Sequence, residues 1–174
     1  MDLPRPRSMP AAAALLAAAL LASLPARAFD LDDVEREAIA LASNRYRPPE
    51  NRVPRALRDL SYDQYRSIRY LPDKAAWRGS GLPFEIMFFH AGFYYAEPVR
   101  IAEIVGQRVQ EFPFSSELFD YGKSGIDTSA IKNAGFAGFR IHYALNTPRY
   151  KDEVLVFLGA SYFRALGKGQ RYGL

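Results

Sequence analysis

Two apolar stretches joined by a short turn constrain this chain more than any other feature of its sequence. Residues 139–145 alternate between apolar and polar, which is the pattern of a β-strand with one buried face. Residues 154–158 are all apolar, which indicates a strand buried on both faces. The connection at 146–150 contains Pro148 and is too short for a helix. The two strands are therefore expected to pair antiparallel.

Further strand patterns lie upstream and are also separated by turns. Residues 84–89 form an apolar run, so this strand is expected to be covered on both faces. Residues 99–105 and 108–112 flank Gly106-Gln107 and predict a hairpin, which Pro113 ends. A long polar loop is expected from 120 to 133.

Two short helices are predicted before these strands. Asp30 is placed to cap a helix over 30–44, where apolar residues recur every three or four positions. Ser61 can cap one or two turns over 61–67. Together with the turns between strands, this predicts a mainly β fold. We expect an antiparallel β-sandwich with a short N-terminal helix, in a single domain.

The N-terminus has the features of an export signal. Arg5 and Arg7 precede an apolar segment of alanines and leucines, and Ala26-Arg27-Ala28 matches a small-x-small cleavage site. The segment is shorter than the roughly 20 residues that span a bilayer, so no stable membrane anchor is predicted. Residues 1–28 are therefore predicted to be a Sec-type signal peptide cleaved after Ala28, which places residues 29–174 in the periplasm.

Composition excludes several classes of site. The chain has 23 Lys and Arg against 19 Asp and Glu, with both signs interspersed, so no nucleic-acid partner is expected. It has no cysteine and only two histidines, His90 and His142, without metal-ligand spacing, so neither a metal nor a cofactor is expected. No phosphate loop, GxSxG motif or pair of facing carboxylates is present, and no catalytic residue is assigned.

Aromatic residues are unusually common: 12 phenylalanines, 11 tyrosines and one tryptophan, none before Phe29. Tyrosine and tryptophan suit wet binding surfaces, because they offer an apolar ring with a polar tip. The segment 161–173 combines such rings with arginine, glutamine and glycine. Trp77 and His90 are weaker candidates, Trp77 being more easily explained as core. The predicted ligand-contacting residues are Tyr162, Arg164, Gln170, Arg171 and Tyr172.

Several sequence words resemble the periplasmic glucan biosynthesis proteins G and D. They run in order through nearly all of residues 29–174, whereas the N-terminal signal lies outside them. Protein G is the nearer of the two, because protein D is usually exported through a twin-arginine signal, which this chain lacks. The words are LRDLSYDQYRSIR (57–69), WRG (77–79), FFHAGF (88–93), PF (113–114), LFDYG (118–122), GFAGFR (135–140), YKDE (150–153) and FLGASYFRALG (157–167).

The resemblance implies a large glucan-binding β-sandwich followed by a smaller immunoglobulin-like domain. It also implies a β-1,2-linked glucose polymer, the backbone of osmoregulated periplasmic glucans, as ligand, and a membrane glucan synthase as a candidate neighbour. Related β-1,2-glucan hydrolases use an acidic general acid that belongs to a later part of the family sequence. The chain is therefore expected to be an N-terminal fragment, truncated within the sandwich; the apolar strand 152–159, expected as an open edge, agrees with this.

Three functions remain open on the sequence alone. The first is a protein that binds and processes periplasmic glucan. The second is a non-catalytic carbohydrate-binding sandwich, and the third is a structural domain of the cell envelope. Protection by soluble β-1,2-glucan would favour the first two over the third, and new reducing ends would require catalysis.

Overall fold

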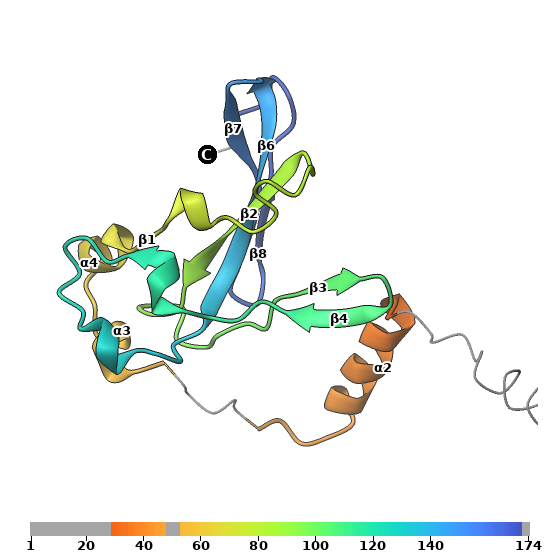
Figure 1. Cartoon of the computed structure of the whole chain (residues 1–174). Helices are drawn as coiled ribbons and strands as arrows, with labels where there is room; N and C mark the ends of the chain where they lie inside the picture. Colours follow the sequence, from red (N-terminus) through yellow and green to blue (C-terminus); the bar gives the residue numbers. More distant parts are fainter. Residues whose placement is uncertain (1–28, 48–52, 172–174) are drawn as a thin grey trace, which may run out of the picture.

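A four-stranded antiparallel sheet forms the centre of the structure (Figure 1). The computed structural model describes residues 29–47 and 53–171. The strand order is β2-β6-β7-β8, and each neighbouring pair is antiparallel. The strands are β2 (Phe84–His90), β6 (Phe136–Thr147), β7 (Tyr150–Leu158) and β8 (Tyr162–Ala165).

Strand β8 differs from the sequence prediction. Residues 162–165 pair with β7, from Leu155 opposite Ala165 to Leu158 opposite Tyr162. The expectation that β7 would remain an open apolar edge is therefore wrong. The turn before β8 depends on Gly159, which has a φ of +64° and donates its amide to the carbonyl of Ala137 at 2.7 Å.

The pairing of β6 with β7 contains a bulge and one very close approach. Ile141 lies opposite Leu155 and His142 opposite Glu153, so Val154 is the extra residue of the bulge. The bulge brings the side chain of Glu153 onto the face of the sheet that carries His142. At Gly138, a Cβ would lie 2.1 Å from the carbonyl oxygen of Phe157, so no side chain fits there.

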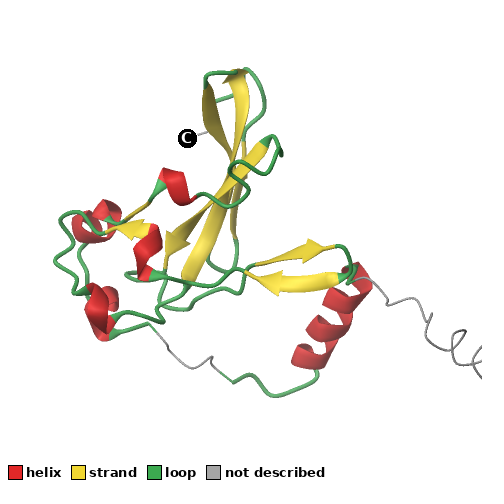
Figure 2. Cartoon of the chain, in the orientation of Figure 1, coloured by secondary structure: helices red, strands yellow, loops and turns green. Residues whose placement is uncertain are grey.

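Short elements flank the sheet (Figure 2). Helices α3 and α4 lie on one side, together with the small β1–β5 sheet, and the β3–β4 hairpin extends away on the other (Figure 1). Their bounds are α3 (Arg55–Arg58), α4 (Tyr62–Ser67), β1 (Arg69–Tyr70), η1 (Pro72–Lys74), β3 (Ala102–Val105), β4 (Arg108–Glu111), η2 (Ser116–Leu118), β5 (Phe119–Asp120) and η3 (Thr128–Ala130).

The N-terminal helix is α2 (Leu31–Ala42), which begins where the sequence predicts. The side chain of Asp30 accepts the amide of Asp33, and the carboxylate of Asp33 accepts the amide of Asp30. No residue of α2 is buried.

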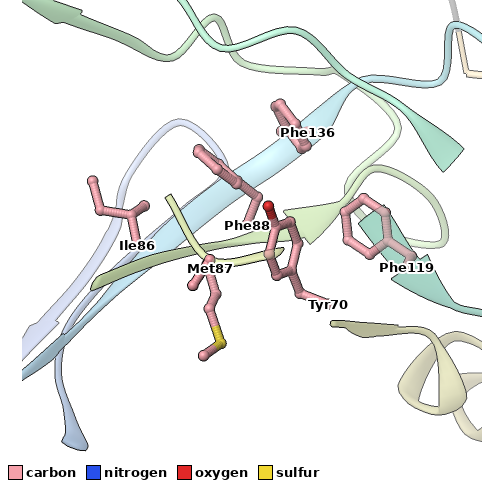
Figure 3. Close-up of a cluster of buried hydrophobic side chains, with 7 residues drawn as sticks. Tyr70, Ile86, Met87, Phe88, Phe119 and Phe136 are labelled. Atoms are coloured by element: carbon pink, nitrogen blue, oxygen red, sulfur yellow. The ribbon is translucent and has the colours of Figure 1, made fainter. Parts of the chain in front are cut away.

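Two clusters of buried side chains form the core. The larger one joins β2 and β6 to β1 and β5 (Figure 3). Two of its ring pairs have favourable aromatic geometry: Tyr70 meets Phe119 edge to face at 85°, and Phe88 stacks on Phe136 with ring centroids 4.4 Å apart. The smaller cluster, centred on the fully buried Leu57, fixes α3 against the loop that contains Ile131.

The mainly β antiparallel fold and its N-terminal helix are confirmed, but burial on the sheet differs from the prediction. His142, on the expected polar face of β6, is buried, whereas Phe157, expected to be buried in β7, is 39% exposed. No helix within 29–47 or 53–171 is both long and apolar enough to cross a bilayer. The predicted signal peptide lies outside the described residues.

Candidate functional site

A cleft of about 500 Å³ lies between α4–β1 and the neighbouring part of the central sheet. This volume is within the range of sites that hold small ligands. Seven of its thirteen lining residues are Tyr or Phe, and three are arginines. The lining residues are Tyr62, Tyr65, Arg66, Ile68, Arg69, Tyr70, Phe88, Phe89, His90, Tyr95, Phe119, Arg140 and Leu158.

Helix α4 supplies one wall of the cleft although it has only six residues. Ser61 accepts the amide of Gln64, and the Gln64 side chain accepts the amide of Ser61, which forms a capping box. Gln64 also donates to the carbonyl of Ser124 at 3.3 Å. These bonds fix the start of the helix, and the spacing of Tyr62, Tyr65 and Arg66 places all three on one face.

Tyr65 connects this wall to the sheet. Its hydroxyl donates to the carbonyl of His90 at 2.7 Å, and its ring stacks on Phe93 with centroids 5.8 Å apart. Burial raises the pKa of the Tyr65 hydroxyl above its ordinary value, so it remains a donor at physiological pH. Tyr62, by contrast, is 60% exposed and contacts Phe93 at 6.3 Å, so one side of its ring is open to a ligand.

Phe93 holds an unusual backbone conformation beside these rings. Its φ is +52°, in the left-handed region that bulky residues rarely adopt. The amide of Phe93 donates to the carbonyl of Leu57 at 2.8 Å, and Gly92 and Tyr95 exchange two backbone hydrogen bonds. These bonds hold the loop that presents Phe93 to Tyr62 and Tyr65.

His90 lies at the cleft but acts as a structural residue. Its Nδ1 lies 2.6 Å from the carbonyl of Ala91 and therefore carries the proton, so Nε2 accepts from the hydroxyl of Tyr121 at 3.0 Å. Burial lowers the pKa of His90 to about 4, although the bond to Ala91 opposes this. Both ring nitrogens are already bonded, so His90 offers a ligand neither a donor nor an acceptor.

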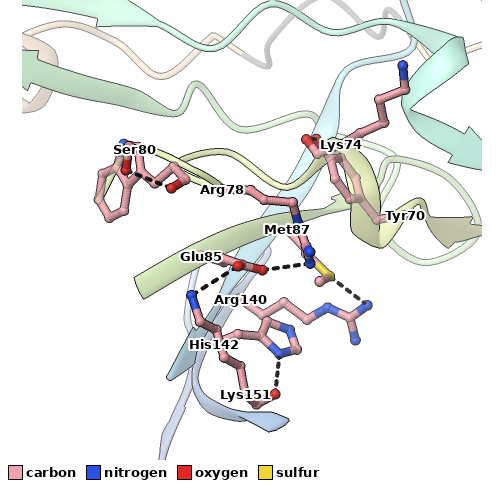
Figure 4. A network of polar contacts seen from close by, with 10 residues as sticks. Tyr70, Lys74, Arg78, Ser80, Glu85, Met87, Arg140, His142 and Lys151 are labelled. Atoms are coloured by element: carbon pink, nitrogen blue, oxygen red, sulfur yellow. Dashed lines mark hydrogen bonds and ion pairs between the residues drawn. The ribbon is translucent and has the colours of Figure 1, made fainter. Parts of the chain in front are cut away.

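A second group of polar side chains lies on the sheet beside the cleft, and we call it the charge ladder; Figure 4 shows the part around Glu85 and His142. It consists of two carboxylates, each held between two cations. Glu85 pairs with Arg78 at 2.7 Å and with Lys151 at 2.9 Å. Glu153 pairs with Arg140 at 3.3 Å and also with Arg164.

His142 lies between the two carboxylates of the charge ladder. Its Nδ1 is 3.3 Å from the carbonyl of Lys151, and its buried Nε2 has no hydrogen-bond partner among the described residues. Burial lowers the pKa of His142, and the charge of Arg140 adds to that effect, against the hydrogen bond to Lys151 and the carboxylates of Glu153 and Glu85. His142 is therefore a neutral component of the ladder.

Comparison with known proteins identifies the family. The family model described as "Periplasmic glucan biosynthesis protein, MdoG" matches residues 29–174. This chain belongs to the MdoG family. It is 54% identical over 156 residues to glucans biosynthesis protein G of Ralstonia nicotianae, and the aligned region covers 90% of this chain and 31% of the relative. It is 48% identical over 147 residues to the protein of that name from Rhodopseudomonas palustris (84% and 29% covered). For the one from Pectobacterium carotovorum, the identity is 41% over 162 residues (91% and 31% covered).

The chain thus spans about 30% of the length of these MdoG relatives. The resemblance that was drawn from the sequence words is confirmed. No group of three or more His, Cys, Asp or Glu side chains in the described part of the chain could hold a metal ion.

The structure brings two of the predicted contact residues to the face of the sheet that borders the cleft. Tyr162 is 48% exposed and lies opposite Leu158, which lines the cleft. Arg164 reaches Glu153 and belongs to the charge ladder. Burial lowers the pKa of Arg164, but hydrogen-bonding and charge contacts with Glu153 and Tyr162 outweigh it, and the net shift is upward.

The remaining predicted residues lie elsewhere. Gln170 closes a local turn, because its Oε1 accepts the amide of Gly167 at 2.8 Å. Arg171 is exposed, and Tyr172 lies outside the described residues. Trp77 donates to Glu103 at 2.8 Å and lines a different hollow, of about 580 Å³, beneath the β3–β4 hairpin.

Sequence reasoning missed the residues of α4 and β1 as a site. Tyr62, Tyr65 and Arg66 recur at a spacing of three and four residues in the segment 61–67 that was predicted as helix, and Arg69 follows just after it. That spacing places aromatic and basic side chains on one face, which is a usable signal. Phe89 and Arg140 reach the cleft from the central sheet, because β2 pairs with β6. No local pattern in the sequence indicates that these two residues line the same cleft.

Proposed function

We propose that the cleft binds a stretch of periplasmic glucan with a β-1,2-linked glucose backbone, as part of a longer protein that processes this polymer. The observation that carries the proposal is the exposed ring of Tyr62 in a cleft of oligosaccharide size that Tyr65 and Phe89 also line. A sugar ring stacks its C–H face on an aromatic ring and keeps its hydroxyl groups bonded. Membership of the MdoG family supports glucan as the ligand.

In this proposal, residues 1–28 are a signal peptide cleaved after Ala28, and residues 29–174 are the N-terminal part of a periplasmic glucan-binding sandwich. Tyr162 extends the stacking surface past Leu158, and Arg164 bonds sugar hydroxyls at the same border. Arg171, Gln170 and Tyr172 would contact more distant sugar units along the chain. A membrane glucan synthase is a neighbour consistent with this location.

The described cleft supports binding rather than bond cleavage. Glycoside hydrolysis by the usual mechanism needs two carboxyl groups that flank the scissile bond. Among the described residues that line the cleft, none is Asp or Glu. The carboxylates of the charge ladder, Glu85 and Glu153, lie outside the cleft lining, and each is held by two cations.

The test is glucan binding by calorimetry and by the shift in unfolding temperature. Neutral β-1,2-glucan oligosaccharides are expected to bind the chain and raise its unfolding temperature. Tyr62→Ala should weaken binding by about fivefold, since one stacking contact is worth about 1 kcal/mol. Tyr150→Ala removes an equally exposed tyrosine at the β6–β7 turn and should leave the affinity unchanged. No binding by the wild-type chain would refute the proposal, and release of new reducing ends would add catalysis to it.

A further inference from the structure

Helix α2 exposes an apolar stripe to solvent. Leu31, Val34 and Leu41 are 79%, 47% and 71% exposed, and no residue of the helix is buried. Their spacing of three and seven residues, with Ala38 between the last two, places them on one face. A helix of this length is marginal in water unless such a face packs against another surface. The stripe therefore indicates a docking surface for α2.

The charge of α2 favours a protein surface over a membrane. Four of its twelve residues are Asp or Glu and one is Arg36, whereas residues 53–171 carry 16 basic and 12 acidic side chains. An anionic lipid surface attracts clusters of basic side chains, so it would repel this acidic helix. The net positive charge of residues 53–171 attracts the helix instead.

An apolar groove of about 1060 Å³ lies where the β3–β4 hairpin leaves the central sheet. Seven of its eleven lining residues are Pro, Val, Ile or Phe, among them Val99, Phe114 and Phe136. The two charged residues of the lining, Arg100 and Glu111, pair with each other at 3.3 Å. The groove therefore suits an apolar occupant and offers a charged one no unpaired partner.

The connection between α2 and the rest of the chain begins at this groove. Val53 packs with Ala134 in the smaller core cluster, and the neighbours of Ala134 in sequence, Asn133 and Gly135, line the groove. Ten residues join Ala42 at the end of α2 to Val53, and ten extended residues reach up to about 35 Å. A short tether of this kind gives an effective concentration in the millimolar range, which favours the groove of the same chain over that of a second copy.

We propose that α2 is a strap that closes onto the groove of its own chain, with Leu31, Val34 and Leu41 entering the groove and the acidic residues of the helix left in water. Figure 1 shows α2 away from the central sheet, which is the open position of this strap. The proposal does not depend on glucan binding, since the groove and the cleft share no lining residue.

Cross-linking tests the contact directly, because the chain has no cysteine of its own. Leu41→Cys/Asn133→Cys places one thiol on the stripe and one in the groove lining. A short bismaleimide is expected to link the two within one chain. The link should form at least about fivefold faster than in Arg36→Cys/Asn133→Cys, whose helix thiol lies on the opposite face of α2. Linked dimers without an intramolecular product would show that a second copy fills the groove, and would overturn the proposal.

Thiol labelling of single variants measures how much of the time the strap is closed. Val34→Cys and Arg36→Cys both change side chains that are exposed in the open position. Closure should slow maleimide labelling of Val34→Cys at least about fivefold relative to Arg36→Cys, and the two rates should become equal in urea. Equal rates without urea would mean that the stripe stays open and would overturn the proposal. Slow labelling of Val34→Cys without any cross-link to Asn133→Cys would assign the stripe to another surface, which also overturns it.

Discussion

The cleft and the charge ladder are neighbours on one sheet, yet they use arginine in opposite ways. In the charge ladder, Glu153 lies between Arg140 and Arg164. In the cleft, Arg66 and Arg69 have no such partner within the described residues. A partly buried cation needs a nearby carboxylate to offset its loss of hydration. An exposed cation is solvated by water and can remain unpaired until a ligand binds. The ladder therefore stabilises the sheet, whereas the cleft arginines are left available for binding.

The largest expected effect concerns the histidine that supports the cleft. The pKa of His90 is about 4 in the folded chain and about 6.5 when unfolded, so the unfolded state binds more protons between these values. Its contribution to stability is present above pH 6.5 and is lost as the pH falls towards 4, by up to about 3 kcal/mol. Urea unfolding across this range measures the loss. NMR titration of the imidazole provides the check, with His142→Gln assigning the signals, and a midpoint near 6.5 would contradict the prediction.

Glu153→Gln tests the ladder side of the comparison. Arg140 and Arg164 would lose the carboxylate between them, and the free energy of unfolding should fall by about 2 kcal/mol because all three side chains are at least partly buried. Glu111→Gln removes the carboxylate of an exposed pair with Arg100 and should cost no more than about 0.5 kcal/mol. Equal effects of the two variants in urea unfolding would show that the ladder does not stabilise the sheet.

Tyr65→Phe tests the link between the cleft wall and the sheet. The variant loses the hydrogen bond from the tyrosine hydroxyl to the carbonyl of His90, which should cost about 1 kcal/mol of stability. Tyr62→Phe is the matched control, since that side chain is 60% exposed, and its stability should not change measurably. Thermal unfolding of both variants compares them, and a Tyr65→Phe variant as stable as wild type would argue against a fixed wall.

The smallest effect is expected for Arg66→Ala. An exposed arginine without an ion pair should change the free energy of unfolding by less than about 0.5 kcal/mol. Denaturant unfolding measures this, with Glu153→Gln as the comparison from the ladder. A loss as large as that of Glu153→Gln would mean that Arg66 is structural, and the contrast between the two regions would disappear.

Local patterns in the sequence were sufficient for most of the secondary structure. The caps at Asp30 and Ser61 and the hairpin around Gly106 are where the residues predict them, because caps and turns are determined by a few adjacent side chains. Burial was harder to predict. Alternation along β6 shows two faces but not which one is covered, so the burial of His142 could not be foreseen.

The candidate site was predicted only in part for the same reason. Tyr162 and Arg164 were selected from composition, and their position beside the cleft follows from the pairing of β8 with β7. Arg140 and Phe89 come from strands that are far apart in the sequence, so only the folded sheet reveals that they line the same hollow as Tyr62. The family resemblance, by contrast, rested on long continuous words and needed no tertiary information.

The double attachment of α4, through its capping box and through the Gln64 side chain, has a thermodynamic consequence. A helix of this length would be unstable in isolation, but here it is already ordered before any ligand arrives. Little protein entropy is then lost on association, and the main entropic cost falls on the flexible polymer. Such a site would select one shape of the glycosidic linkages from the many that a free glucan samples.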